Sequence, residues 1–198
     1  PDTGKTFYMT DYDGTNRLIF SPHYENTPWT LDKSGNGLQL LPFLVISCVI
    51  MPPMPMIRRK AILETIGVFK VDLPSCEDWE FWIRCCYKNI RFQYLEEINA
   101  LSMMRLHANS MTRNRIVMVN SFIEVRQRLR PHLENQVLFS INERLLNNDY
   151  LEQCIVIQQN QGHLKGAIQA LKIAKDRKSI LLFFEACLIF VLPTSFSL

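Results

Sequence analysis

The spacing of apolar residues changes near Asn114, and this change limits most strongly what the chain can fold into. Before it, short runs rich in aromatic and β-branched residues alternate with loops rich in Pro and Gly, which is typical of strands joined to short helices. After it, apolar residues recur at helical spacing. We therefore predict an α/β portion over residues 1–114, followed by an α-helical extension over residues 115–198.

Three interruptions divide the helical extension: Pro131, the run Asn147-Asn148-Asp149, and Gly162. The predicted helices cover residues 117–130, 132–146, 150–159, 163–175 and 180–191. In the α/β portion, we predict strands over residues 6–10, 17–20, 91–95 and 98–107. Residues 38–51 read as a helix followed by a buried strand, and residues 60–66 as a short helix ended by Gly67.

Composition is that of an ordinary folded protein. Of the 198 residues, 47% are hydrophobic and the net charge is +3, with no run of Lys and Arg, so we expect no nucleic-acid partner. The six cysteines form no C-x-x-C pair and lie mostly in apolar text, which favours reduced, buried thiols in the cytoplasm over a disulfide framework or a zinc site.

We also make predictions for the two ends of the sequence. The chain begins at Pro1 without a signal-peptide pattern, which suggests a piece of a longer protein. The apolar run Ile180–Leu192 is too short to span a bilayer and contains Glu185, so we predict a packed helix there. Peripheral contact of this run with the inner membrane surface is the alternative. Self-association through the helical extension is a further expectation.

The stretch from Ser75 to Arg84 is interpreted as a helix start with two acids in its first turn. Ser75 is the predicted N-cap. At about 100° per residue, Glu77 falls opposite the apolar stripe that begins at Trp79, whereas Asp78 falls at its edge. Glu80, Arg84 and Lys88 fall on the same side as Glu77. Glu77 should therefore be solvated, and Asp78 should border an apolar wall. The alternative is that both acids only stabilise the helix N-terminus.

Three segments in this order resemble the C-terminal half of a family 2 glycosyltransferase catalytic domain, which has the GT-A fold. They are IRRKAILETIGVF, then CEDWEFWIRC, then IRFQYLEEINALSMMRLHANSMTRN, and the resemblance extends from Thr6 to Asn114. It implies a partial GT-A-like, acceptor-side mixed sheet with helices, ahead of the helical extension.

The resemblance also implies roles for particular residues. Asp78 matches the aspartate that acts as general base in inverting members of the family, and Glu77 matches the preceding acid, which orients the helix or binds acceptor. Substrate contacts are implied for Arg105, Trp79 and Arg58. His107 lies in the region near the nucleotide diphosphate, so it could ligate a divalent cation, Mn²⁺ or Mg²⁺.

Each of these assignments has a structural alternative. Arg105 could pair with Glu96 or Glu97, His107 could be a hydrogen-bonded histidine, and Arg58 could be a surface charge. Asp11-Tyr12-Asp13 has the letters of the D-x-D metal motif. We interpret it as a turn, with a metal pair at Asp11 and Asp13 as the alternative, because a Gly-Thr-Asn turn follows it.

The sequence therefore predicts part of an inverting glycosyltransferase that moves a sugar from a nucleotide-sugar donor to an acceptor hydroxyl and is inactive without the donor-binding half. The absence of a Q-x-x-R-W motif favours transfer of single sugars over processive synthesis. The alternative, from a different functional class, is a helical binding or assembly module without catalysis.

Overall fold

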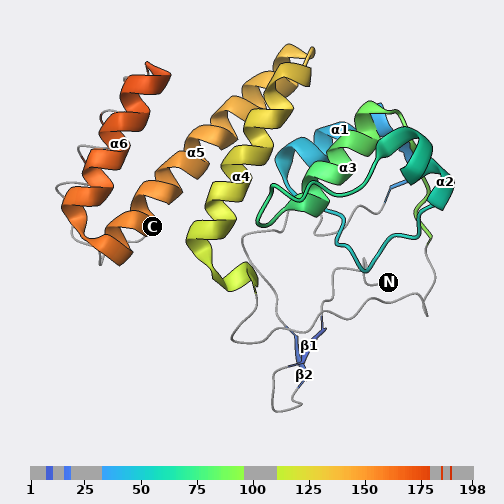
Figure 1. Ribbon diagram of the computed structural model, residues 1–198, viewed down its shortest axis with the longest axis horizontal. Helices are drawn as coiled ribbons and strands as arrows, with labels where there is room; N and C mark the ends of the chain where they lie inside the picture. Colours follow the sequence, from blue (N-terminus) through green and yellow to red (C-terminus); the bar gives the residue numbers. More distant parts are fainter. Residues whose placement is uncertain are drawn as a thin grey trace. The chain divides into compact units, whose positions relative to one another are not determined.

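A computed structural model of the chain defines residues 8–10, 16–18, 33–95 and 111–178, together with Phe184 and Leu188 (Figure 1). Its contacts divide the chain into two units. The first covers Pro1–Asp72 and Cys76–Arg113, and the second covers Leu73–Ser75 and Asn114–Leu198.

The first unit is built on two packed helices, α1 (Gly37–Ile46) and α3 (Glu77–Tyr87). Their facing sides supply its core, which includes Leu40, Leu44, Val45, Trp79, Phe81, Trp82 and Cys86. The helices approach closely at Gly37, where a Cβ atom would lie 2.5 Å from the Cα of Cys86. Glycine is needed at this point because the backbone of α3 occupies the space of a side chain.

A short helical segment connects α1 to α3. It consists of α2 (Arg59–Ala61) and the π-helical turn η2 (Ile62–Ile66). Gly67 ends it with φ at 82°, a left-handed conformation that residues with a Cβ rarely adopt. The predicted short helix over residues 60–66, ended by Gly67, is therefore confirmed.

The strands form two separate antiparallel pairs. β1 (Tyr8–Thr10) pairs with β2 (Asn16–Leu18), with Tyr8 opposite Leu18. β3 (Gly35–Asn36) pairs with β4 (Arg91–Phe92). The predicted hairpin at the start of the chain is confirmed, but residues 47–51 form no strand and the strand at residue 91 is shorter than predicted.

The prediction of a GT-A-like mixed sheet is wrong for the part of the chain that the structure defines, which is mostly helical. Strands of two or three residues are too short to build a sheet with a buried face. The apolar residues of the first unit are instead covered by helix-on-helix packing of α1 and α3. The predicted strand over residues 98–107 lies outside the defined residues.

Over residues 114–178, the second unit contains three helices in succession. α4 (Arg115–Leu129) leads through a 3₁₀ turn, Arg130–His132, to α5 (Gln136–Gln161) and α6 (His163–Arg177). The α5 helix packs against both α4 and α6. One cluster contains Val119, Ile123 and Leu146, another contains Cys154, Ala170, Ile173 and Ala174, and Tyr150 packs against both. A 3₁₀ turn, Met111–Arg113, precedes α4.

The sequence predicts a break at Asn147-Asn148-Asp149, but α5 continues through it. The reason is a tertiary contact that outweighs the low helix propensity of these residues. Asp149 Oδ2 accepts a hydrogen bond from Arg126 Nε of α4 at 2.6 Å, and both side chains are largely buried. Asn142 Nδ2 also donates to the carbonyl of Arg126 at 3.2 Å. One of the polar residues that suggested a break, Asp149, therefore joins α5 to α4 instead.

None of the helices defined here is both long and apolar enough to cross a bilayer. Of the predicted helix over residues 180–191, the structure defines Phe184 and Leu188, which are helical and exposed. The rest of Ile180–Leu192 lies outside the defined residues.

Replacing Gly37 by Ala should lower the free energy of unfolding by about 1–3 kcal/mol, because the added methyl group forces α1 away from α3. Urea unfolding followed by tryptophan fluorescence measures this change. Gly35→Ala is the matched control, since the nearest atom there is the flexible Gln39 Oε1, at 3.0 Å. Equal stability of Gly37→Ala and wild type would show that the crossing has room for a side chain.

Breaking the pair between α4 and α5 with Asp149→Leu should cost about 3–5 kcal/mol, because Arg126 would stay buried without its carboxylate. The double variant Arg126→Met/Asp149→Leu should recover most of this loss, because apolar residues of similar size avoid the desolvation of both charges. Urea unfolding of the two variants checks the difference. A double variant no more stable than the single one would contradict this account.

Candidate functional site

The candidate site lies at the N-terminus of α3, where three acids fall in the first turn: Glu77, Asp78 and Glu80. The N-cap is Cys76, which is buried and left-handed, with φ at 60° and ψ at 19°. Ser75, the predicted N-cap, lies one residue earlier and is fully buried. Left-handed conformations are costly for residues with a Cβ, so the packing around Cys76 must hold this turn in place.

The two carboxylate oxygens of Asp78 have different partners. Oδ1 accepts a hydrogen bond from the backbone N–H of Trp79 at 2.8 Å, which satisfies one of the free donors of the first helical turn. The thiol of Cys48, in the segment after α1, donates to Oδ2 with Sγ at 3.7 Å. Asp78 is half-buried, so solvent still reaches it. The backbone N–H of Asp78 itself is a further hydrogen-bond donor to this carboxylate.

Cys48 is a hydrogen-bond partner of Asp78 that the sequence did not reveal. Its side chain also lies 3.5 Å from the carbonyl of Ile50, so its single thiol hydrogen is shared between two acceptors. Burial, with the neighbouring charge of Asp78 as a second cause, raises the pKa of the Cys48 thiol far above its usual range. The group is therefore a stable hydrogen-bond donor rather than a nucleophile.

The pKa of Asp78 is raised above its ordinary value. Desolvation is the largest cause, since burial disfavours the charged form. The hydrogen bond from the Trp79 N–H opposes this effect, whereas the nearby charge of Glu77 adds to it. A carboxylate in this setting holds a proton more tightly than an aspartate in water, which is the property needed to accept one from a weakly acidic hydroxyl.

Trp79 anchors the turn that carries Asp78. Its ring is 2% exposed, and its indole Nε1–H donates to the carbonyl of Leu44 in α1 at 2.7 Å. The resemblance implied a substrate contact for Trp79, but the structure places it in the core, where a ligand does not reach it. Its role in the site is to fix the position of the preceding residue.

Arg84 connects α3 to the loop that follows η2. Its guanidinium pairs with Glu80 at 2.9 and 2.7 Å and donates to the carbonyls of Ile66 at 2.6 Å and Val68 at 3.0 Å. Sequence periodicity places Glu80 and Arg84 opposite the apolar stripe of α3, yet their side chains are only 13% and 18% exposed. A helical period shows which residues share a face, but not that a loop covers it.

Of the remaining predicted site residues, the structure describes Arg58 and Glu77. Arg58 is the exposed N-cap of α2, and its guanidinium has no ion pair within the defined residues. Glu77 is half-buried beside Asp78. Four other predicted site residues lie outside the defined residues: Arg105, His107, Asp11 and Asp13. In the part of the chain that is defined, no group of three or more His, Cys, Asp or Glu side chains is placed to hold a metal ion.

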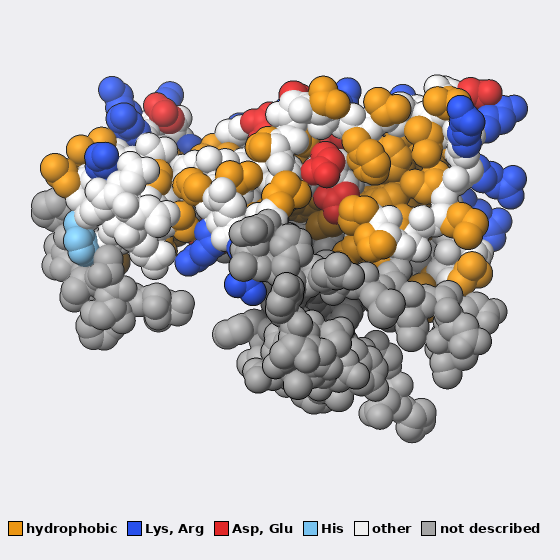
Figure 2. Space-filling model, turned by 60° about the horizontal axis from the view of Figure 1, so that its bottom comes forward, with side chains coloured by type: hydrophobic (Ala, Val, Ile, Leu, Met, Phe, Trp, Pro, Cys, Tyr) orange, Lys and Arg blue, Asp and Glu red, His pale blue; other side chains and the backbone are white. Residues whose placement is uncertain are grey.

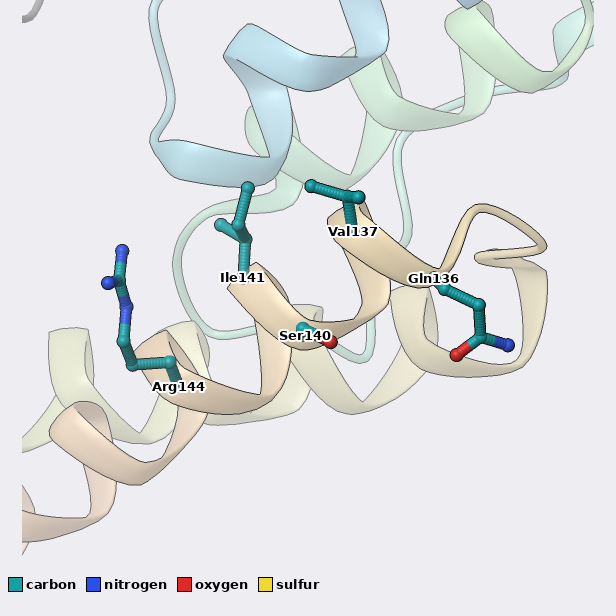
Figure 3. Close-up of a pocket in the computed structure, with 5 residues that line it drawn as sticks. All are labelled: Gln136, Val137, Ser140, Ile141 and Arg144. Carbon is teal, nitrogen blue, oxygen red and sulfur yellow. The ribbon is translucent and has the colours of Figure 1, made fainter.

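Two hollows lie in the helical unit. Figure 3 shows the larger one, which is lined by five residues of α5: Gln136, Val137, Ser140, Ile141 and Arg144. The smaller is a gap between α5 and α6, beside Tyr150 and Cys154. Neither hollow is lined by a residue of α3.

Comparison of the chain with known protein families, with curated proteins and with solved structures gave no match.

The raised pKa of Asp78 predicts a specific dependence of stability on pH. A carboxyl whose pKa is higher in the folded chain than its ordinary value of 3.8 favours folding most at low pH. This contribution is lost as the pH rises through the folded pKa. The free energy of unfolding of the wild type, relative to that of Asp78→Asn, should therefore fall as the pH is raised from about 3 to about 7.

Urea unfolding of both proteins across this range measures the difference, and carboxyl ¹³C NMR of Asp78 gives its pKa directly. If the pKa of Asp78 were at or below the ordinary value for aspartate, and the difference in free energy of unfolding between the two proteins did not change with pH, burial would not disfavour the charged carboxylate.

Proposed function

We propose that the chain forms the acceptor-side part of an inverting, non-processive glycosyltransferase in which Asp78 is the general base. The observation that carries the proposal is the environment of this carboxylate: half-buried at a helix N-terminus, with its pKa raised by desolvation and solvent still in reach. The order of the motifs around it supports the same class.

The reaction assigns Asp78 one proton transfer. An acceptor hydroxyl donates a hydrogen bond to the Asp78 carboxylate. As the hydroxyl oxygen forms a bond to the anomeric carbon, the bond from that carbon to the nucleoside diphosphate breaks, and the proton passes to Asp78. Attack from the side opposite the leaving group inverts the anomeric configuration.

The surroundings of Asp78 suit this role in two ways. Trp79, fixed by the Leu44 carbonyl, positions the backbone N–H that orients Oδ1. The Cys48 thiol, kept protonated by its raised pKa, stays a donor to Oδ2 and does not compete for the proton. A general base needs a fixed orientation more than a strong charge, since misplacement by a fraction of a hydrogen-bond length lowers the rate.

A divalent cation belongs to the same proposal, with His107 as a ligand, to neutralise the sugar diphosphate. The defined residues include no cluster that fits such an ion. No step assigned to Asp78 passes through it.

A binding or assembly module without catalysis is the second candidate. Exposed apolar side chains in the helical unit favour this second candidate. Val137 on α5, for example, is 67% exposed. In this case the acids at the start of α3 would serve only to stabilise the helix.

In the full-length protein, Asp78→Asn should lower kcat by about 10²–10⁴-fold, because an amide cannot accept the proton. Release of nucleoside diphosphate from a panel of nucleotide sugars with hydroxyl acceptors measures turnover. Glu77→Gln is the matched control, which removes the neighbouring charge and should have a smaller effect. Turnover of Asp78→Asn at the wild-type rate would exclude Asp78 as the base, and a wild type that turns over no donor would favour the assembly module.

A further inference from the structure

The outer face of α6 carries an apolar stripe that no other defined element covers. Leu164, Ile168 and Leu171 are 64%, 43% and 45% exposed. They are spaced four and three residues apart, so they lie along one side of the helix. The opposite side holds the small residues Ala167, Ala170 and Ala174, which pack against α5. The α6 helix therefore has two apolar sides, and α5 covers one of them.

Positive charge accompanies this outer stripe. At about 100° per residue, Lys175 falls within the stripe, and Lys165 and Lys172 fall along one flank. All three are exposed. The single carboxylate of α6, Asp176, lies on the far margin of that flank, and Arg177 on the inner side is paired with Glu143 at 2.8 Å. Figure 2 shows hydrophobic and Lys or Arg side chains lying together over α6.

We propose that this face, Leu164, Ile168 and Leu171 with Lys165, Lys172 and Lys175, binds the surface of an anionic lipid membrane. A helix that combines an exposed apolar stripe with lysines is suited to lie in the plane of a bilayer interface. Its three apolar side chains enter the boundary between head groups and acyl chains, and the lysine stems extend so that the ammonium groups reach lipid phosphates.

Charge and shape both favour lipid over a protein partner. A second copy docking on the same face would bring the lysines of the two copies together, with one carboxylate per helix to offset three of them. The stripe is also the convex side of one helix rather than a groove, so it fits a flat, fluid surface better than a shaped ligand. This inference is independent of the proposed glycosyl transfer.

Co-sedimentation of the full chain with lipid vesicles tests the proposal. The chain should bind vesicles containing about 30% phosphatidylglycerol in phosphatidylcholine, bind pure phosphatidylcholine at least about tenfold more weakly, and bind more weakly at high salt. Each lysine near an anionic surface contributes about fivefold in affinity, so Lys165→Gln/Lys172→Gln/Lys175→Gln should reduce binding by about 100-fold. Leu164→Gln/Ile168→Gln/Leu171→Gln should reduce it by a similar or larger factor.

Two controls separate this face from the rest of the chain. Lys60→Gln/Lys70→Gln/Lys88→Gln removes the same charge from the first unit, and Val137→Gln makes the same kind of change at an exposed position of α5. Both should bind as the wild type does. All variants keep Phe184 and Leu188, and circular dichroism checks that each is folded.

Three results would overturn the proposal. The first is no binding to anionic vesicles by the wild type. The second is binding that persists at the wild-type level in both α6 variants, which would place the contact elsewhere in the chain. The third is a dimer of the wild type, lost in the apolar variant, without any binding to vesicles, which would identify a second copy as the partner.

Discussion

The first unit depends on the close packing of α3 against α1. The buried indole of Trp79 fills the interface, and its N–H is bonded to the Leu44 carbonyl, a polar group that would otherwise be costly to bury. Pro42 lies inside α1. Because proline has no backbone N–H, the carbonyl of the residue four positions earlier, Leu38, loses its usual helical partner. The two helices can meet this closely because Gly37 has no side chain at the crossing.

The electrostatics of Asp78 follow from this packing. Trp79 cannot be buried without drawing the preceding residue toward the core, and this partial burial raises the pKa of the Asp78 carboxyl. The first turn of a helix provides N–H groups and a favourable dipole that limit the cost. Arg84 adds a second constraint from the other side of α3, because its bonds to two backbone carbonyls hold the loop after η2 in position. The raised pKa proposed to make Asp78 a base therefore follows from the packing of the core.

Local signals in the sequence predicted local structure well. Gly67 as a helix end, the hairpin at the start of the chain and the helices beginning near residues 115 and 163 all follow from residue types and spacing. The sequence also placed Asp78 at the edge of the apolar stripe, and Asp78 is half-buried, but Glu77, which was predicted to be solvated, is half-buried as well. These features depend on neighbours a few residues away.

Features that depend on distant residues were not predictable in the same way. Nothing in the spacing connects Cys48 to Asp78, thirty residues later. The continuity of α5 depends on Arg126 in another helix, and the burial of Arg84 depends on a loop that folds over it. The mixed sheet was inferred by analogy from motif order, and motif order does not specify how many residues pair into strands. The tertiary partner decided each of these outcomes.

The continuity of α5 has a mechanical consequence for the second unit. Tyr150 packs against the cluster shared with α4 and also against the cluster shared with α6, and it lies one residue after the ion-paired Asp149. One continuous helix, α5, therefore joins the two apolar clusters, and no break in it lies between them. Loss of packing at one cluster should therefore destabilise the other through α5, so we expect α4, α5 and α6 to unfold in one cooperative transition.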